Sequence, residues 1–124
     1  MSRDEAGRVL LCDDALAFPV LFRQWMRECG VELVGHADNA EDSVALAHRH
    51  RPYVIVVDHL LGDVTSEGLA PRLRAAAPTA KLLLISGMHD EALTEAALAA
   101  GADAHLSKAA SSQAMCDAVR ALLP

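Results

Sequence analysis

Five polar side chains stand at points where short aliphatic runs of the chain end. They are Asp13, Asp14, Asp58, Ser86 and Lys108. If these ends meet in space, the carboxylates repel one another and keep at least one pKa raised unless a cation neutralises them. An all-oxygen site with two or three Asp suits Mg²⁺, which keeps several waters and leaves room for a phosphate oxygen.

Ser86 and Lys108 complete a set with the chemistry of phosphoryl transfer. Lysine supplies a fixed positive charge and serine a hydroxyl donor, and the oxygens of a transferring phosphoryl group need both. One Asp can then act as the nucleophile and form an aspartyl-phosphate. Each residue alone has an ordinary explanation, because a strand-end Asp often caps a helix, a Ser closes a turn and a Lys is solvated. A functional site is favoured because all five residues are predicted to lie together where the strands end.

The aliphatic runs are predicted to be β-strands. Tyr53–Asp58 holds five residues suited to a strand that is covered on both faces, and it ends in a carboxylate. Four further runs are predicted strands: Arg8–Cys12, Val31–Ala37, Lys81–Ile85 and Ala104–Ser107.

Helical spacing and capping residues fill the intervals between these runs. Pro19 fits the first turn of the first helix and Gly30 its end, and Pro71 fits the opening turn of the third. The predicted helices cover about Phe18–Cys29, Asp38 or Asn39 to His50, Gly68–Ala77, Asp90–Ala100, and a last helix that begins after Ser111 or Ser112.

Five strand–helix units of about 25 residues each predict right-handed crossovers and a parallel sheet with helices on both faces. In such an α/β fold the carboxyl ends of all strands meet at one edge, where ligands bind. We expect one domain over residues 1–124, with residues 1–7 as a flexible tail.

Composition narrows the classes of function. The chain has 124 residues and a net charge of −6, which argues against direct nucleic-acid binding by this domain. Residues 1–8 have no apolar signal-peptide core, and no window is long and apolar enough to span a membrane, so we expect a cytoplasmic protein. The cysteines Cys12, Cys29 and Cys116 form no CxxC pair, and we expect reduced thiols rather than a disulfide or a zinc site.

The order of these motifs resembles the receiver domain of two-component response regulators, and the resemblance covers nearly the whole chain. The matching segments are Val9-Leu10-Leu11-Cys12-Asp13-Asp14, Val54-Ile55-Val56-Val57-Asp58, Leu83-Leu84-Ile85-Ser86-Gly87 and Gly101-Ala102-Asp103-Ala104-His105-Leu106-Ser107-Lys108. The family's fold is the flavodoxin-like (βα)5 arrangement.

The resemblance implies a phosphorylation switch with Asp58 as the phosphoacceptor. It implies that Mg²⁺ is held by Asp13, Asp14, Asp58 and the backbone carbonyl of Leu60. Lys108 and Ser86 then contact the phosphoryl group, and His105 occupies the family's aromatic switch position, three residues before the lysine.

The implied partners are a histidine kinase and an output domain or downstream protein. The sequence of the first strand and helix is similar to that of regulators with a helix-turn-helix DNA-binding output. A second copy of the domain is a further partner that the sequence allows. No output domain is expected within these 124 residues. We expect a phosphoacceptor rather than a conventional enzyme. Its catalysis would be limited to its own phosphotransfer and dephosphorylation.

The chain departs from the family pattern at three places. His105 stands in place of an aromatic residue, and histidine as a residue type can gain or lose a proton near neutral pH, although an ordinary strand residue is an equal explanation. Ala109 stands where a proline usually follows the lysine, and we expect a trans bond because a cis bond to a non-proline residue costs about 3 kcal/mol. The loop from His59 to Gly68 is about two residues longer than usual, counted along the sequence.

The sequence also allows three other interpretations. A receiver-like interaction module that no longer depends on phosphate fits the altered loop and His105. A phosphohydrolase is disfavoured because Asp13 and Asp14 are adjacent, whereas those enzymes typically carry Asp-x-Asp after the first strand. A transition-metal site formed by His59, His89 and His105 is a minor alternative to solvated histidines.

Overall fold

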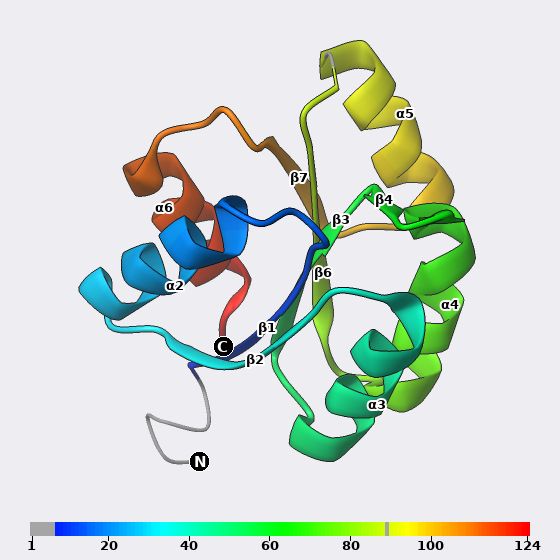
Figure 1. Ribbon diagram of the computed structural model, residues 1–124, viewed down its shortest axis with the longest axis horizontal. Coiled ribbons are helices and arrows are strands. Elements are labelled where there is room, and N and C mark those ends of the chain that lie inside the picture. Colours follow the sequence, from blue (N-terminus) through cyan, green and yellow to red (C-terminus); the bar gives the residue numbers. More distant parts are fainter. Residues whose placement is uncertain (1–6, 89) are drawn as a thin grey trace.

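Five parallel strands form the sheet at the centre of the molecule (Figure 1). The structure is a computed structural model, and it describes residues 7–88 and 90–124. The expected tail therefore lies outside the described residues except for Gly7. The sheet order is β2-β1-β3-β6-β7, with β3 in the middle. The strands are β1 (Arg8–Cys12), β2 (Glu32–Ala37), β3 (Val54–Asp58), β6 (Lys81–Ser86) and β7 (Ala104–Ser107).

Helices cover both faces of this sheet, which confirms the predicted α/β architecture and its flavodoxin-like strand order (Figure 1). Two helices, α2 and α6, pack on one face, and α3, α4 and α5 pack on the other. Their bounds are α2 (Phe18–Glu28), α3 (Ala40–His50), α4 (Ser66–Ala76), α5 (Asp90–Ala100) and α6 (Ser112–Leu122).

Strand β3 shows why the sequence specifies a sheet that is buried on both faces. Successive side chains of a strand point to opposite faces. Val54 and Val56 therefore pack into the layer of α2 and α6, while Ile55 and Val57 pack under α3, α4 and α5. All four are essentially inaccessible to solvent. The aliphatic run leaves Asp58 as the first polar side chain of the strand, at the carboxyl edge of the sheet.

Capping residues decide where the helices begin and end. The Asn39 side chain accepts a hydrogen bond from the Asp42 N–H at 2.8 Å, so Asn39 rather than Asp38 caps α3. Ser111 rather than Ser112 caps α6 in the same way. Gly30 ends α2 with φ of 74°, a left-handed conformation that glycine adopts without strain.

The prediction for α4 was wrong by about two residues. The helix begins at Ser66 rather than near Gly68, because Thr65 caps it through a long hydrogen bond to the Gly68 N–H at 3.4 Å. As a result, Pro71 lies inside the helix and not in its opening turn.

The segment after Asp58 forms a β-hairpin, where the sequence predicted a loop. Two short strands, β4 (Leu60–Leu61) and β5 (Val64–Thr65), pair antiparallel across the turn Gly62-Asp63. Gly62 has φ of 64°, as this tight turn requires. At the base of the hairpin the Ser66 N–H donates to the His59 carbonyl at 2.7 Å. The extra residues of this segment therefore build a defined element beside Asp58.

Candidate functional site

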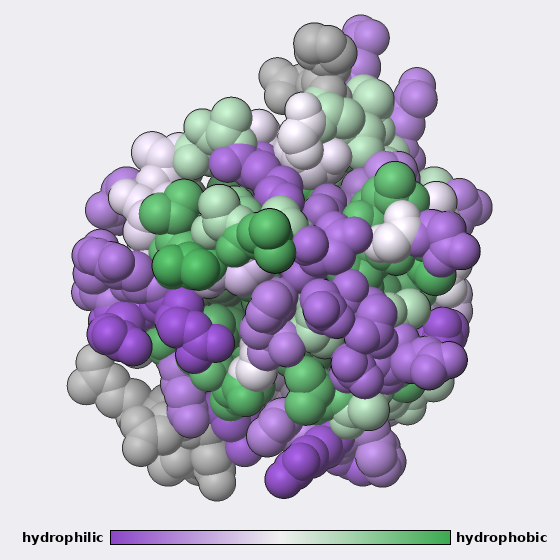
Figure 2. All heavy atoms as spheres, viewed as in Figure 1, coloured by the Kyte–Doolittle hydropathy of each residue, from purple (hydrophilic) through white to green (hydrophobic). Residues whose placement is uncertain are grey.

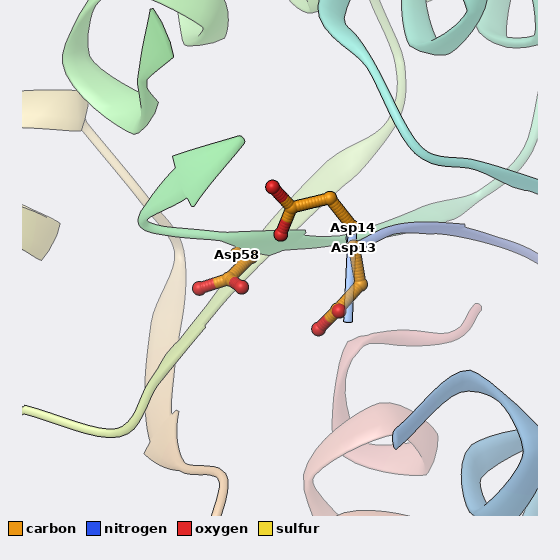
Figure 3. A group of neighbouring side chains, drawn as sticks. All are labelled: Asp13, Asp14 and Asp58. Atoms are coloured by element: carbon orange, nitrogen blue, oxygen red, sulfur yellow. The ribbon is translucent and has the colours of Figure 1, made fainter. Parts of the chain in front are cut away.

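The acidic cluster is formed by the ends of two adjacent strands. Asp13 and Asp14 follow β1, and Asp58 is the last residue of β3. Their carboxyl groups gather in one small region at the carboxyl edge of the sheet (Figure 3). One carboxylate oxygen from each residue lies within 4.8 Å of those of the other two. Exposure differs among them, since Asp13 is fully buried, Asp58 half-buried and Asp14 exposed.

Lys108 neutralises part of this charge. It follows β7, and its Nζ lies 2.7 Å from Asp13 Oδ2 and 3.3 Å from Asp58 Oδ2. The same Nζ stands 4.7 Å from the centre of the Phe18 ring, so the ammonium is held over an aromatic face as well. Lysine and the two carboxylates come from three different strands, which only the fold brings together.

Burial and neighbouring charges have opposing effects on the pKa values of Asp58 and Lys108. Burial raises the pKa of Asp58, the Lys108 ammonium opposes this rise, and the nearby Asp13 and Asp14 charges add to it. Burial by itself lowers the pKa of Lys108, but the contacts with Asp13 and Asp58 outweigh it and raise the value overall. Lys108 is therefore a permanent cation, and Asp58 is the carboxyl group that gives up its proton less readily than usual.

Each of the two aspartates that follow β1 is held in place by its own hydrogen bonds. The Ala15 N–H donates to Asp13 Oδ1 at 2.7 Å, and His36 Nε2 lies 2.7 Å from the Asp13 carbonyl oxygen. The Gly62 N–H, at the tip of the β4–β5 hairpin, donates to Asp14 Oδ2 at 2.9 Å. Sequence reasoning missed His36 and Gly62, because neither belongs to a motif and both lie far along the chain from Asp13 and Asp14.

Ser86 and His105 occupy different environments. Ser86 ends β6, is nearly buried, and its Oγ accepts a hydrogen bond from the Met88 N–H at 3.1 Å. Its carbonyl accepts from the Lys108 N–H at 2.9 Å, which ties β6 to the lysine. His105 is exposed on β7 and pairs in register with Leu84, so its side chain lies on the α5 face of the sheet.

Leu60 lies in the hairpin with a backbone carbonyl that the ladder does not use. Hydrogen-bonded and non-hydrogen-bonded pairs alternate along an antiparallel ladder. Because Ser66 donates to the His59 carbonyl, the next pair, Leu60 with Thr65, is a non-hydrogen-bonded pair. The Leu60 carbonyl is therefore open to another partner.

The three histidines of the alternative transition-metal site are not brought together as a described group. His59 Nδ1 lies 2.9 Å from Ser66 Oγ, which uses one ring nitrogen inside the hairpin base. His89 lies outside the described residues, and His105 is exposed. Within residues 7–88 and 90–124, the group of three or more ligand-type side chains that fits a metal ion is the acidic cluster.

The acidic cluster fits a hard divalent cation on its own chemistry. Its donors are carboxylate oxygens with a free backbone carbonyl nearby in sequence, which is the ligand type that Mg²⁺ prefers. Asp13 Oδ2 is buried and, apart from the ion contact with Lys108, accepts no well-directed hydrogen bond. A buried carboxylate oxygen in this state is stabilised by any further cation.

Exposed apolar side chains border the acidic cluster on the α2 side. Leu16 is 93% and Val20 68% exposed, and with Asp14 and His36 they line a shallow hollow of about 240 Å³. The space-filling view shows hydrophobic atoms gathered over α2 on this face (Figure 2). Large exposed aliphatic side chains next to a charged site are typical of a surface that binds another protein.

A match to a known protein family identifies the class of this molecule. Residues 9–120 match the model of the response regulator receiver domain. The chain belongs to the response regulator receiver domain family. None of the helices in the described part of this receiver domain is long and apolar enough to cross a membrane.

The curated relatives of the receiver domain include a response regulator from several strains of Staphylococcus aureus. Response regulator protein VraR of Staphylococcus aureus (strain NCTC 8325 / PS 47) is 25% identical over 114 residues, which cover 91% of this chain and 54% of that protein. The chain thus spans about half the length of the curated relatives it matches.

Two solved structures show the same fold. The receiver domain of the putative response regulator NarL from Mycobacterium tuberculosis has a TM-score of 0.78 at 25% identity, covering 91% of this chain and 95% of that one. A response regulator from Burkholderia pseudomallei, solved with a phosphorylated aspartic acid, a calcium ion and citrate, has a TM-score of 0.76 at 25% identity. That match covers 92% of this chain and 71% of the other.

Proposed function

We propose that this receiver domain is a phosphorylation-dependent switch in which Asp58 accepts the phosphoryl group. One observation carries the proposal. The ammonium of Lys108 contacts both Asp58 and the buried Asp13, while Asp14 completes a cluster of three carboxylates around the same point. Charges of both signs are thereby held ready at the end of the central strand, which is the arrangement that a transferring phosphoryl group needs.

The residues divide the chemistry among them. An Asp58 carboxylate oxygen attacks phosphorus, the new O–P bond forms, and the bond from phosphorus to the donor histidine nitrogen breaks, with that nitrogen taking up a proton from solvent. Lys108 supplies positive charge to the phosphoryl oxygens as they develop negative charge. Asp13, Asp14, Asp58 and the Leu60 carbonyl would hold Mg²⁺. When bound, the ion neutralises phosphoryl oxygens and lowers the repulsion among the carboxylates.

Ser86 is proposed as the residue that reports phosphorylation to the rest of the domain. Its Oγ accepts from the Met88 N–H, so its own hydroxyl proton is still available to a phosphoryl oxygen. Turning toward that oxygen strains or breaks the bond to Met88 and shifts the connection between β6 and α5. His105, on the neighbouring strand and facing α5, is the proposed second switch residue.

The proposed donor is a histidine kinase, and the proposed reader is an output domain or downstream protein. Support for a docking donor comes from the exposed Leu16 and Val20 beside Asp14. Support for an output domain comes from length, since this chain covers 54% of VraR. The likeness of the first strand and helix to regulators with a helix-turn-helix output makes DNA binding the proposed role of the output, and the net charge of −6 leaves such binding to the output rather than to this domain.

A direct test is phosphorylation by acetyl phosphate with Mg²⁺. We expect the intact protein to gain the mass of one phosphoryl group, which is lost on treatment at alkaline pH. The Asp58→Asn variant should gain none. Asp63→Asn, which removes an equal charge from the exposed hairpin turn, should react like the wild type. An unmodified wild type under these conditions, together with no binding of beryllofluoride, would overturn the proposal.

A receiver-like module that works without phosphate is the second candidate. It is favoured by the Gly62 N–H, which already occupies one oxygen of Asp14. The same experiment separates the two, because such a module binds its partner equally well with and without acetyl phosphate and is indifferent to Asp58→Asn.

A further inference from the structure

Two cysteines that lie far apart in the sequence meet between α2 and α6. Cys29 is the residue that follows α2, and Cys116 lies in the second turn of α6. The Cys29 N–H donates to the Trp25 carbonyl at 3.0 Å, and the Cys116 thiol donates to the same carbonyl oxygen at 3.4 Å. The Trp25 carbonyl oxygen therefore accepts one hydrogen bond from each of the two cysteines.

Arg120 fixes the same juxtaposition from the next turn of α6. Its guanidinium donates to the Cys29 carbonyl oxygen, and residues 116 and 120 lie one turn apart on a single helix face. Burial and the adjacent Cys29 thiol raise the pKa of Cys116 to about 12, and the Arg120 charge only partly opposes this.

The two sulfurs differ in access to solvent. Cys116 is 6% exposed, whereas Cys29 is half-buried and lines an open cavity of about 520 Å³ together with Gly30, Arg120 and Leu123. Cys12, in contrast, is completely buried in β1 beside Asp13, on the other side of the sheet core. A small oxidant can therefore reach Cys29 first, and Cys116 is the nearest thiol to respond.

We propose that Cys29 and Cys116 form a reversible disulfide that joins α2 to α6 when the protein meets a peroxide. The site lies apart from the phosphoryl chemistry, since neither cysteine takes part in the hydrogen bonds and ion pairs described above for the acidic cluster. Cys29 stands at the end of a helix and is followed by Gly30, around which the space is open, so its backbone can adjust as the sulfurs approach bonding distance.

The reaction balances with hydrogen peroxide as the oxidant. The Cys29 sulfur attacks one peroxide oxygen, the S–O bond forms, the O–O bond breaks, and the released hydroxide takes up the thiol proton as water. The Cys116 sulfur then attacks the sulfenic sulfur of Cys29. The S–S bond forms, the S–O bond breaks, and the second hydroxide leaves as water with the proton of Cys116. Two thiols are oxidised and one peroxide is reduced to two waters.

The test treats the reduced chain with a small excess of hydrogen peroxide, alkylates the remaining thiols and maps the peptides by mass spectrometry. We expect an intramolecular Cys29–Cys116 cross-link, loss of two alkylatable thiols, and reversal by dithiothreitol. Cys12 in the same molecule should remain alkylatable after unfolding. The oxidised protein should also melt at a temperature higher by about 5 °C or more, because the cross-link closes a long loop in the unfolded chain.

Variants make the outcome unambiguous. Cys29→Ser should give neither cross-link nor melting shift, and Cys116→Ser should accumulate a sulfenic acid on Cys29 that a dimedone probe labels. Circular dichroism melts of both reduced variants establish that they fold. Oxidation in urea is the matched control, since an unfolded chain joins all three cysteines in mixed pairs. The proposal is overturned if the native protein gives that same mixture, gives only intermolecular dimers, or keeps both thiols free while Cys116→Ser is labelled.

Discussion

At the scale of single residues, Asp58 bears a charge that the fold tolerates poorly. Its pKa is raised by burial and by two neighbouring carboxylates, in spite of Lys108 at 3.3 Å. Ionisation of Asp58 therefore opposes folding when no divalent cation is present. The same feature suits a phosphoacceptor, because a poorly solvated carboxylate gains from any partner that brings positive charge or spreads its own charge.

A first prediction follows for pH dependence. Below the ordinary Asp pKa of about 4 the carboxyl group is protonated in both states, so wild type and Asp58→Asn should be equally stable. As pH rises, the unfolded chain releases this proton before the folded chain does, and wild-type stability falls until pH exceeds the raised folded value. At neutral pH without Mg²⁺, Asp58→Asn should be more stable by on the order of 1 kcal/mol.

Urea denaturation at several pH values in the presence of a chelator measures this difference. Asp63→Asn is the control, since it alters the net charge equally but lies in the exposed hairpin turn. A stability gain that is the same at low and neutral pH would count against the proposed origin in Asp58 ionisation.

Lys108 leads to a second prediction. Its removal leaves Asp13 Oδ2 buried without a cation, which should destabilise Lys108→Gln by about 2 kcal/mol without divalent ions. Mg²⁺ should recover more stability in this variant than in the wild type, because the ion then supplies the missing positive charge. Denaturant titrations with and without Mg²⁺ measure both effects. Lys81→Gln, at an exposed position that begins β6, should change little, and an equal Mg²⁺ response of both variants would contradict the explanation.

At the scale of elements, the β4–β5 hairpin is the unusual part of the site. It follows Asp58 directly and places the Gly62 N–H on Asp14. An Asp side chain at the exposed edge of a sheet is otherwise free to rotate, so this hydrogen bond orders one of the proposed metal ligands. The hairpin therefore links the length of the segment after Asp58 to the affinity of the cation site.

A matched pair of glycine substitutions tests this link. Gly62 and Gly30 both have positive φ, and a Cβ at either position meets nothing within 4 Å, so alanine should cost each about 1 kcal/mol of stability through backbone strain alone. Only Gly62→Ala should also weaken Mg²⁺ binding, by about three- to tenfold, because the N–H to Asp14 is displaced. Calorimetric titration of both variants gives the comparison. Equal Mg²⁺ affinities would show that the hairpin does not order Asp14.

The strands and the edge at which their ends meet could be predicted from sequence, because both follow from local patterns. Aliphatic runs that end in Asp13, Asp58, Ser86 and Lys108 are short-range signals, and parallel order brings those ends to one side. The hairpin was missed because Leu60–Leu61 and Val64–Thr65 are too short to show a period. The proximity of Cys29 and Cys116, which share the Trp25 carbonyl oxygen, depends on how two helices pack against each other, and no spacing along the chain encodes that.

At the scale of the whole molecule, an excess of negative charge combines with a cluster of carboxylates at one edge of the sheet. The chain carries a net charge of −6, and three of its carboxylates stand together at one edge of the sheet. Two different ionic effects can relieve this repulsion. Monovalent salt screens all charges weakly, whereas a divalent ion that occupies the cluster binds the folded state specifically.

The final prediction separates these effects through thermal stability. A ligand at one hundred times its dissociation constant stabilises a folded protein by about 2.7 kcal/mol, which for a chain of this size raises the melting temperature by roughly 10 °C. MgCl₂ should therefore raise the melting temperature well above the value in NaCl of the same ionic strength. Asp14→Asn should lose most of the Mg²⁺ increment and keep the NaCl response, because screening acts on the remaining charges. If both salts give equal shifts at equal ionic strength, the acidic cluster acts only through its charge and not as a cation site.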